Sequence, residues 1–161
     1  MEFINALVSD ESVRILGQLF LALTFGSILG LERIFAHRSA GMRTYALVST
    51  ASALFVIISE MVLKQYLSIN VSTDPLRMAS NIIIGVGFLG TGIIIFKDST
   101  LVGLTTAAGL WLAAGIGMAV GYGLYVPAFL GTIFTLFIFT VMFYVEDALL
   151  KMHDGNPHPD R

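Results

Sequence analysis

Acidic and basic side chains stand at the end of the first long apolar stretch, where they could bind an ion or a partner. This stretch closes on Gly30-Leu31-Glu32-Arg33. The negative end of the helix dipole favours Arg33 there but disfavours Glu32. We therefore expect a compensating cation for Glu32, and the candidates are Arg33, Arg38 and Arg43. Two interpretations stay open, namely an interfacial salt-bridge cluster or a cation or partner site that includes Glu32.

A second polar group opens the third apolar stretch. Asp74 is placed to cap a helix whose first residue is Pro75. Arg77 is unexpected near the positive end of the helix dipole, and it could pair with Asp74 across one turn. Asn81 follows one turn later, and its amide requires a hydrogen bond in the bundle. Asp74, Arg77 and Asn81 are therefore candidate functional residues.

Thr105 and Thr106 occupy the first turn of the fourth apolar stretch. Their hydroxyls could cap amides or bond neighbouring helices, and a helix N-terminus can also hold an anion. Capping is the favoured interpretation. Gln18, in the first stretch, is a further candidate for an interhelical hydrogen bond.

No catalytic constellation is found. The chain has no cysteine, no histidine inside an apolar stretch, and no serine with a histidine and a carboxylate on its side of the membrane. We expect no enzyme activity and no cofactor, and the residues that would bind a metal stay unknown.

These residues must be positioned by membrane-spanning helices. Hydrophobic residues make up 56 % of the 161 residues and charged ones 12 %, against about 25 % charged in soluble domains. A span needs about 20 apolar residues. The sequence predicts an all-α polytopic membrane protein, a bundle of about five transmembrane helices over residues 15–145, with short tails at 1–14 and 146–161. The five apolar runs are Ile15–Leu31, Tyr45–Leu63, Ala79–Phe96, Leu104–Gly121 and Leu124–Val145.

The charged residues predict which partners surround the protein and how it is oriented in the membrane. A net charge of −2 gives no basic surface for nucleic acid, so the expected partner is the lipid bilayer. Five spans place the tails on opposite sides, and one side then holds six basic residues against three on the other. The positive-inside rule predicts an N-terminus outside and a cytoplasmic C-terminus. The six are Arg33, Arg38, Arg43, Lys97, Lys151 and Arg161.

Small residues at four-residue spacing predict close helix packing, because helices in lipid associate through close backbone approach. We expect the thin first, third and fourth spans to form an inner cluster, with the bulkier second and fifth spans toward lipid. The phenylalanines of the fifth span (Phe129, Phe134, Phe137, Phe139 and Phe143) would face lipid or a second copy. Glycines in the third span could instead mark an unwound segment lining an ion path. The packing candidates are Ala22, Gly26, Gly30, Gly85, Gly87, Gly90, Gly92, Gly109, Ala113, Gly117 and Gly121.

Four segments together resemble the MgtC/SapB family of bacterial inner-membrane proteins. They are GSILGLER (26–33), AGMRTYALVS (40–49), DPLRMASNIIIGVGFLGTGIII (74–95) and GLTTAAGLWLAAGIGMAVGYG (103–123). The resemblance implies a five-helix membrane domain with its N-terminus outside, and it adds Gly41, Arg43 and Thr44 to the candidate functional residues. Two positions depart from the family pattern: Ile34 stands where a second acidic residue is common, and Val102 where an arginine is usual. Many members also carry a cytoplasmic domain after the last span.

The resemblance implies a link to adaptation to low magnesium and to virulence. One branch is similar to proteins that bind and restrain the membrane ATP synthase, and other members are described as magnesium transport proteins. We therefore expect a non-enzymatic protein that docks another membrane protein, with the ATP synthase as one partner to consider. The alternative is a magnesium or other cation transporter or channel, with Glu32, Asp74 and Asn81 near the ends of its path. A magnesium ion could be a ligand or substrate. Magnesium usually binds carboxylates, yet Glu60 is the one carboxylate inside a predicted span. Several small-residue faces also make a homodimer plausible.

Overall fold

A computed structural model describes residues 9–67, 74, 76–97 and 99–154 of the chain. Four helical stretches are long and apolar enough to cross a membrane (Asp10–Phe35, Met42–Gln65, Leu104–Gly121 and Tyr125–Leu149), and Arg77–Ile93 is a shorter apolar helix. The predicted all-α polytopic membrane fold is confirmed. In chain order the elements are α2 (Asp10–Phe35), α3 (Met42–Leu67), α4 (Arg77–Ile93), β1 (Ile95–Lys97), β2 (Thr100–Val102), α5 (Leu104–Gly121), α6 (Tyr125–Phe137), the π-helical turn η1 (Ile138–Met142) and α7 (Phe143–Asp154).

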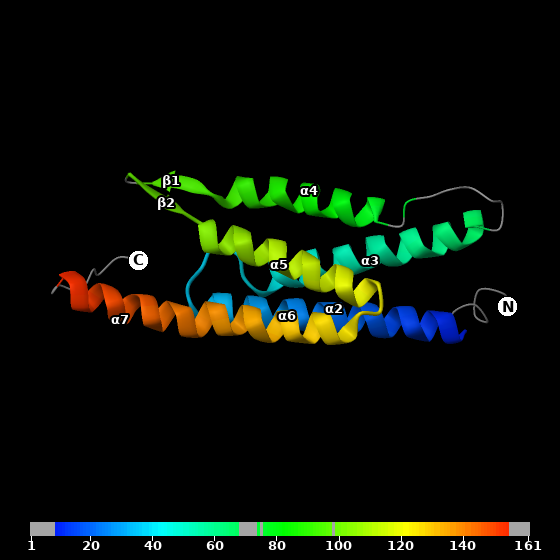
Figure 1. Cartoon of the computed structure of the whole chain (residues 1–161), viewed down its shortest axis with the longest axis horizontal. Coiled ribbons are helices and arrows are strands. Elements are labelled where there is room, and N and C mark those ends of the chain that lie inside the picture. The colour runs from blue at the N-terminus through cyan, green and yellow to red at the C-terminus, as the bar shows by residue number, and fades with distance from the viewer. Residues whose placement is uncertain (1–8, 68–73, 75, 98, 155–161) are drawn as a thin grey trace.

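The helices form an elongated bundle in which successive spans run in opposite directions (Figure 1). Helices α6 and α7, joined through η1, make one continuous span whose far end extends past the other helices (Figure 1). Helix α2 packs mainly on α3, α3 also packs on α5, and α4 packs on α5. Helix α4 lies along one outer side of the bundle, away from α2 and α6 (Figure 1).

The second span, α3, packs closely on both α2 and α5, so the expectation that it lies toward lipid, outside an inner cluster, is wrong. Both predicted small-residue ridges pack against its backbone. A Cβ added at Gly26 of α2 would lie 2.6 Å from the Tyr45 carbonyl oxygen, and one added at Gly121 of α5 would lie 2.8 Å from that of Ala53. Gly30 meets Met42 and Gly117 meets Ser49 in the same way. The glycines are needed because backbone, which cannot move aside, occupies the space of a side chain.

The third span is shorter than the apolar run that predicted it. Helix α4 ends at Ile93, and the run continues into β1, which pairs with β2 in an antiparallel hairpin that joins Ile95 to Val102 and Lys97 to Thr100. Gly103 closes the hairpin with a φ of 97°, and a Cβ there would lie 2.5 Å from the Ile93 carbonyl oxygen. Seventeen helical residues rise about 26 Å, slightly less than the roughly 30 Å of hydrocarbon.

The outer boundaries of the predicted spans also shift. Helix α2 begins at Asp10 rather than Ile15, because the Ser9 hydroxyl accepts a hydrogen bond from the Ser12 amide at 3.3 Å and caps the first turn. Helix α7 continues to Asp154, so the described part of the 146–161 tail is helical.

The interhelical hydrogen bond predicted for Gln18 is confirmed. Its buried Nε2 donates to the carbonyl oxygens of Val120 at 3.0 Å and Gly121 at 2.9 Å. These carbonyls lie in the last turn of α5, where carbonyls lack the amides of a following turn, and the Val120 carbonyl also accepts from the Gly123 amide at 2.9 Å. Gln18 therefore ties α2 to the C-terminus of α5.

Candidate functional site

One polar pocket forms where the end of α2, the start of α5 and the turn η1 with α7 meet. Its volume is about 460 Å³. We call it the Arg33 pocket. It brings together three residues predicted from sequence, Glu32, Arg33 and Thr105, although 73 positions separate Glu32 from Thr105 in the chain. Its other lining residues are Phe35, Ala36, Arg38, Ile138, Phe139, Thr140, Met142, Phe143, Tyr144 and Glu146.

Arg33 is the buried charge of this pocket. Its side chain is 3 % exposed, and its Nε donates to Oε2 of Glu32, which is 20 % exposed. The guanidinium carbon lies 3.5 Å from the centroid of the Phe139 ring. Of the three cations predicted to compensate Glu32, Arg33 is thus the one that pairs with it. The ion pair and the aromatic face together offset the cost of removing a guanidinium from water.

Phe139 reaches Arg33 from the π-helical turn η1. It is 5 % exposed, whereas Phe129, Phe134, Phe137 and Phe143 are each about half exposed. The expectation that all five phenylalanines face outward is therefore wrong for Phe139. An extra residue in a π-helical turn shifts the side chains that follow it around the helix, and such turns are frequent at functional sites.

Tyr45 connects the pocket to the core of the bundle. Its ring meets Phe139 edge to face, with centroids 6.4 Å apart, and its hydroxyl donates to the Thr106 carbonyl oxygen at 3.3 Å. Tyr45 is fully buried rather than at the membrane interface. A Cβ at Gly109 would collide with the Tyr45 hydroxyl, so this glycine makes room for the tyrosine.

The capping role predicted for Thr105 and Thr106 is wrong. The N-cap of α5 is Gly103, and no side-chain hydrogen bond caps the helix. Thr105 is exposed and lines the Arg33 pocket, whereas Thr106 is 2 % exposed.

Other motif residues lie near the pocket without lining it. Arg43 and Thr44 are exposed in the first turn of α3. Gly41 precedes that helix, and a Cβ there would lie 3.0 Å from the Ile34 side chain. Sequence reasoning missed Phe139, Thr140 and Glu146, because nothing in the sequence marks the π-helical turn that positions them.

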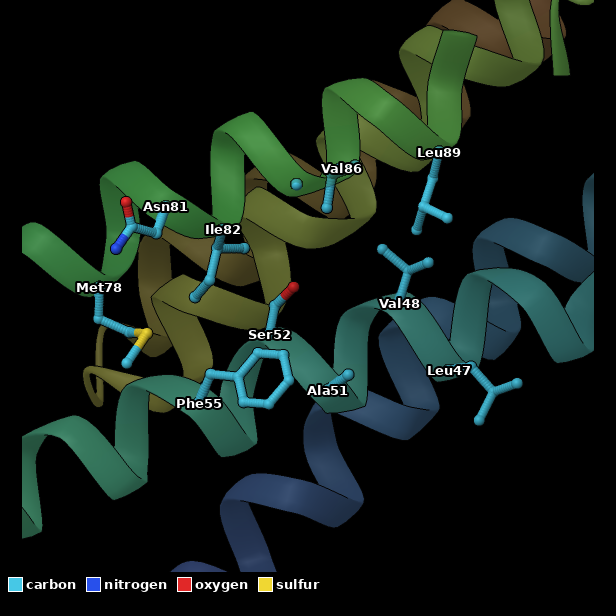
Figure 2. A pocket seen from close by; sticks show the side chains of 11 residues that line it. Leu47, Val48, Ala51, Ser52, Phe55, Met78, Asn81, Ile82, Val86 and Leu89 are labelled. Carbon is cyan, nitrogen blue, oxygen red and sulfur yellow. The ribbon is translucent and has the colours of Figure 1, made fainter. Parts of the chain in front are cut away.

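A separate apolar groove of about 540 Å³ lies between α3 and α4, and we call it the α3–α4 groove (Figure 2). Val48 of α3 and Leu89 of α4 point toward each other across it (Figure 2). Asn81 lines the groove, is exposed, and forms no hydrogen bond with any residue that the structure describes. The remaining lining residues are Leu47, Ala51, Ser52, Phe55, Met78, Ile82, Gly85 and Val86.

The glycines of α4 are largely open to the surroundings. A Cβ at Gly85, Gly87 or Gly92 would meet no heavy atom within 4 Å, whereas one at Gly90 would lie 3.5 Å from the Ala107 Cβ of α5. Gly90 therefore packs inside the bundle. The other three have no packing contact within the described chain, so their predicted packing role stays a prediction for contacts with another molecule.

Asp74 and Arg77, at the start of α4, line neither of the two cavities. The Asp74 Oδ1 accepts from the Leu76 amide at 2.9 Å, and Leu76 rather than Asp74 is the N-cap of α4. No ion pair joins Asp74 to Arg77, both of which the structure describes. Burial, with smaller contributions from the Glu60 and Asp74 carboxylates, raises the pKa of Tyr122 above 10.0. Pro75 lies outside the described residues.

Carboxylate and histidine side chains do not gather into a metal site. Among the described residues, no three His, Cys, Asp or Glu side chains lie close enough to hold an ion together. Magnesium keeps most of its water and can bind through one or two carboxylates, so any such contact here would rest on Glu32 or Glu146 in the Arg33 pocket.

A family model described as the MgtC family matches residues 19–148. The chain is 40 % identical over 135 residues to the Escherichia coli K12 protein named "Putative magnesium transporter YhiD", covering 83 % of this chain and 63 % of that one. It is 36 % identical over 108 residues to an uncharacterized protein of Haemophilus influenzae, covering 65 % and 45 %. Protein MgtC of Brucella abortus is 41 % identical over 87 residues, covering 54 % and 34 %. The chain thus spans between a third and two thirds of the length of these relatives. No solved structure matches it.

Proposed function

Because the chain belongs to the MgtC family, we propose that it is a non-enzymatic protein of the bacterial inner membrane that serves magnesium homeostasis by docking another membrane protein. The predicted orientation, with the N-terminus outside and the C-terminus cytoplasmic, belongs to this proposal. The magnesium link rests on the names of the relatives. The membrane ATP synthase is one partner that the family resemblance suggests.

The observation that carries the docking proposal is the unsatisfied face of α4 along the α3–α4 groove. Asn81, Gly85 and Gly92 recur at spacings of four and seven residues, which places them on one face of the helix. Within the described chain, Asn81 has no hydrogen bond, and a Cβ added at either glycine would meet no heavy atom of another helix within 4 Å.

A transmembrane helix of the partner is the occupant that fits this face. An acyl chain can fill an apolar groove, but it has no polar group to bond the Asn81 amide. A helix carrying a serine, threonine, asparagine or glutamine can do so, and glycines let its backbone approach closely. The proposal therefore commits to a partner helix that meets Asn81 with a polar side chain.

Single-cysteine crosslinking tests this contact, since the chain has no cysteine of its own. A cysteine at Gly85 should crosslink to a partner in native membranes, and Gly85→Leu should abolish co-purification of that partner. Gly115→Leu is the matched control, because a Cβ at Gly115 of α5 also meets nothing within 4 Å. Crosslinking between two copies of this chain alone would replace the partner with a homodimer and overturn the proposal.

The transporter alternative is favoured by the name of the E. coli relative. It predicts saturable magnesium flux into liposomes that contain only this chain. Flux that is lost in both Glu32→Ala and Asp74→Ala would refute the docking proposal. Absence of flux, together with a crosslink that depends on Gly85, supports it.

A further inference from the structure

A second guanidinium in the Arg33 pocket lacks a counter-ion. Arg38 follows the end of α2, and its guanidinium carbon lies 5.9 Å from the centroid of the Phe143 ring. Its Nε is buried and has no hydrogen-bond partner in the described chain. No carboxylate in the described residues forms an ion pair with Arg38. A buried charged donor without an acceptor is costly, which points to a ligand that the protein itself does not supply.

The two arginines of the pocket differ in whether a carboxylate of the described chain pairs with them. Arg33 stands over Phe139 and donates its Nε to Glu32, so this pair is neutral. Arg38 stands over Phe143, one helical turn further along the same continuous helix. A guanidinium that stacks on a ring keeps its N–H groups at the edge of its plane, where they match two oxygens of a phosphate or carboxylate.

The start of α5 also contributes to the lining of the pocket. Thr105 lines the pocket and is exposed, and no side chain caps the first turn of its helix. The unpaired first-turn amides and the helix dipole both favour an anion there. The lining of the pocket thus combines Arg38 with Thr105 at the N-terminus of α5.

Apolar side chains complete the pocket. Phe35, Ile138 and Met142 line it and are 74 %, 48 % and 44 % exposed. The pocket lies where α2 ends at Phe35 and α5 begins at Leu104, and the ends of membrane-spanning helices are the level at which phospholipid head groups sit. An anionic head group with its acyl chain fits this mixture of donors and apolar surface.

We propose that the Arg33 pocket binds a phosphate group through Arg38 and the first turn of α5. Anionic phospholipid and free inorganic phosphate share this chemistry. Glu146 also lines the pocket and is exposed, so its carboxylate opposes binding of an anion. The proposal is independent of the docking function, because the α3–α4 groove shares no lining residue with this pocket.

Native mass spectrometry of the purified full-length chain tests the proposal, with phosphatidylglycerol, phosphatidylcholine and inorganic phosphate as separate probes. Arg38→Gln should weaken phosphatidylglycerol binding about tenfold or more, the effect of losing one charge-assisted hydrogen bond. Arg38→Lys should also weaken it, since lysine keeps the charge but lacks the planar fork. Glu146→Gln should tighten it. Lys97→Gln, which removes an exposed cation of the β1–β2 hairpin, should leave it within about twofold.

The outcomes separate the two sources of phosphate. Phosphatidylglycerol binding that depends on Arg38 supports the proposal with lipid as the source. Inorganic phosphate binding with the same dependence, without lipid binding, supports it with the free ion as the source. Equal binding by Arg38→Gln and the unchanged chain overturns it, provided that both variants unfold at the same temperature. An equal loss in Lys97→Gln also overturns it, because binding would then follow surface charge alone.

Discussion

The close contact between α2 and α3 predicts opposite stability changes for one substitution made at two places on the same helix. Gly26 and Gly17 both lie within α2. A Cβ at Gly26 would lie 2.6 Å from the Tyr45 carbonyl oxygen, 2.8 Å from the Ser49 Cβ and 2.9 Å from the Ala46 Cα, whereas one at Gly17 would meet nothing within 4 Å. We therefore expect Gly26→Ala to destabilise the bundle and Gly17→Ala to stabilise it.

The magnitudes follow from two opposing contributions. Alanine is more favourable than glycine inside a helix by about 1 kcal/mol, and this gain applies at both positions. Overpacking costs about 1–3 kcal/mol, and the upper end applies at Gly26 because two of its three contacts are backbone atoms. Separating the helices would also lengthen the 2.8 Å hydrogen bond from the Ser49 hydroxyl to the Ala22 carbonyl oxygen. Gly26→Ala should thus lose about 2 kcal/mol and Gly17→Ala should gain about 1 kcal/mol.

Equilibrium unfolding in mixed detergent micelles measures this difference. The fluorescence of Trp111 can follow the unfolding of α5, because Trp111 is the only tryptophan in the chain. The two variants should differ by about 3 kcal/mol, roughly a hundredfold in the unfolding equilibrium constant. If Gly26→Ala proved as stable as Gly17→Ala, α2 and α3 would not meet at Gly26, and the close packing of α2 on α3 would be refuted.

Three further predictions concern polar contacts. Gln18→Leu removes two hydrogen bonds to the end of α5 and should cost about 1 kcal/mol in the same unfolding assay; an unchanged free energy would contradict the contact. Glu32→Gln leaves the buried Arg33 without its counter-ion and should lower the free energy of unfolding by about 3 kcal/mol. The double variant Glu32→Gln/Arg33→Met should lower it by less, which a double-mutant cycle can measure. The pKa of Tyr122 is raised, so stability should fall as pH rises above the unfolded value of about 10. Asp74→Asn should lower this pKa in an ultraviolet titration, in which the Tyr122→Phe variant identifies the signal of Tyr122. A titration curve that Asp74→Asn leaves unchanged would show that the Asp74 carboxylate does not act on Tyr122.

The sequence predicts the spans well because membrane crossing depends on length and apolar character alone. It does not reveal which helix each ridge meets. Glycine ridges on α2 and α5 show that a close partner exists, and both ridges meet α3, whose own sequence contains no glycine. The end of α4 at Ile93 was also hidden, because Ile95 and Phe96 of the β1–β2 hairpin are as apolar as the helix before them.

The Arg33 pocket was only half predictable for a related reason. Glu32 and Thr105 could be identified as polar residues at span ends, where each requires a partner. Phe139, in contrast, reads as one of several phenylalanines on an apolar helix. Its inward position depends on the π-helical turn and on the Tyr45 ring beside it, both of which are set by tertiary packing.

The polar groups in the interior favour docking over conduction. Several buried hydroxyls in the described core are bonded to backbone carbonyls, as Ser49 is to Ala22, Thr132 to Ala128 and Thr135 to Gly131. The Thr50 hydroxyl and the Gln18 Oε1 are buried without such a partner, and neither is a carboxylate. The buried charge among the described residues is Arg33, a cation. A magnesium ion crossing this interior would lose water without gaining carboxylates and would meet a guanidinium of like charge. Two further groups without a partner in the described chain line the cavities: the exposed Asn81 amide on the α3–α4 groove and the buried Arg38 Nε at the Arg33 pocket. Ligands that satisfy them must approach from outside the bundle, as a partner helix or an anionic head group does.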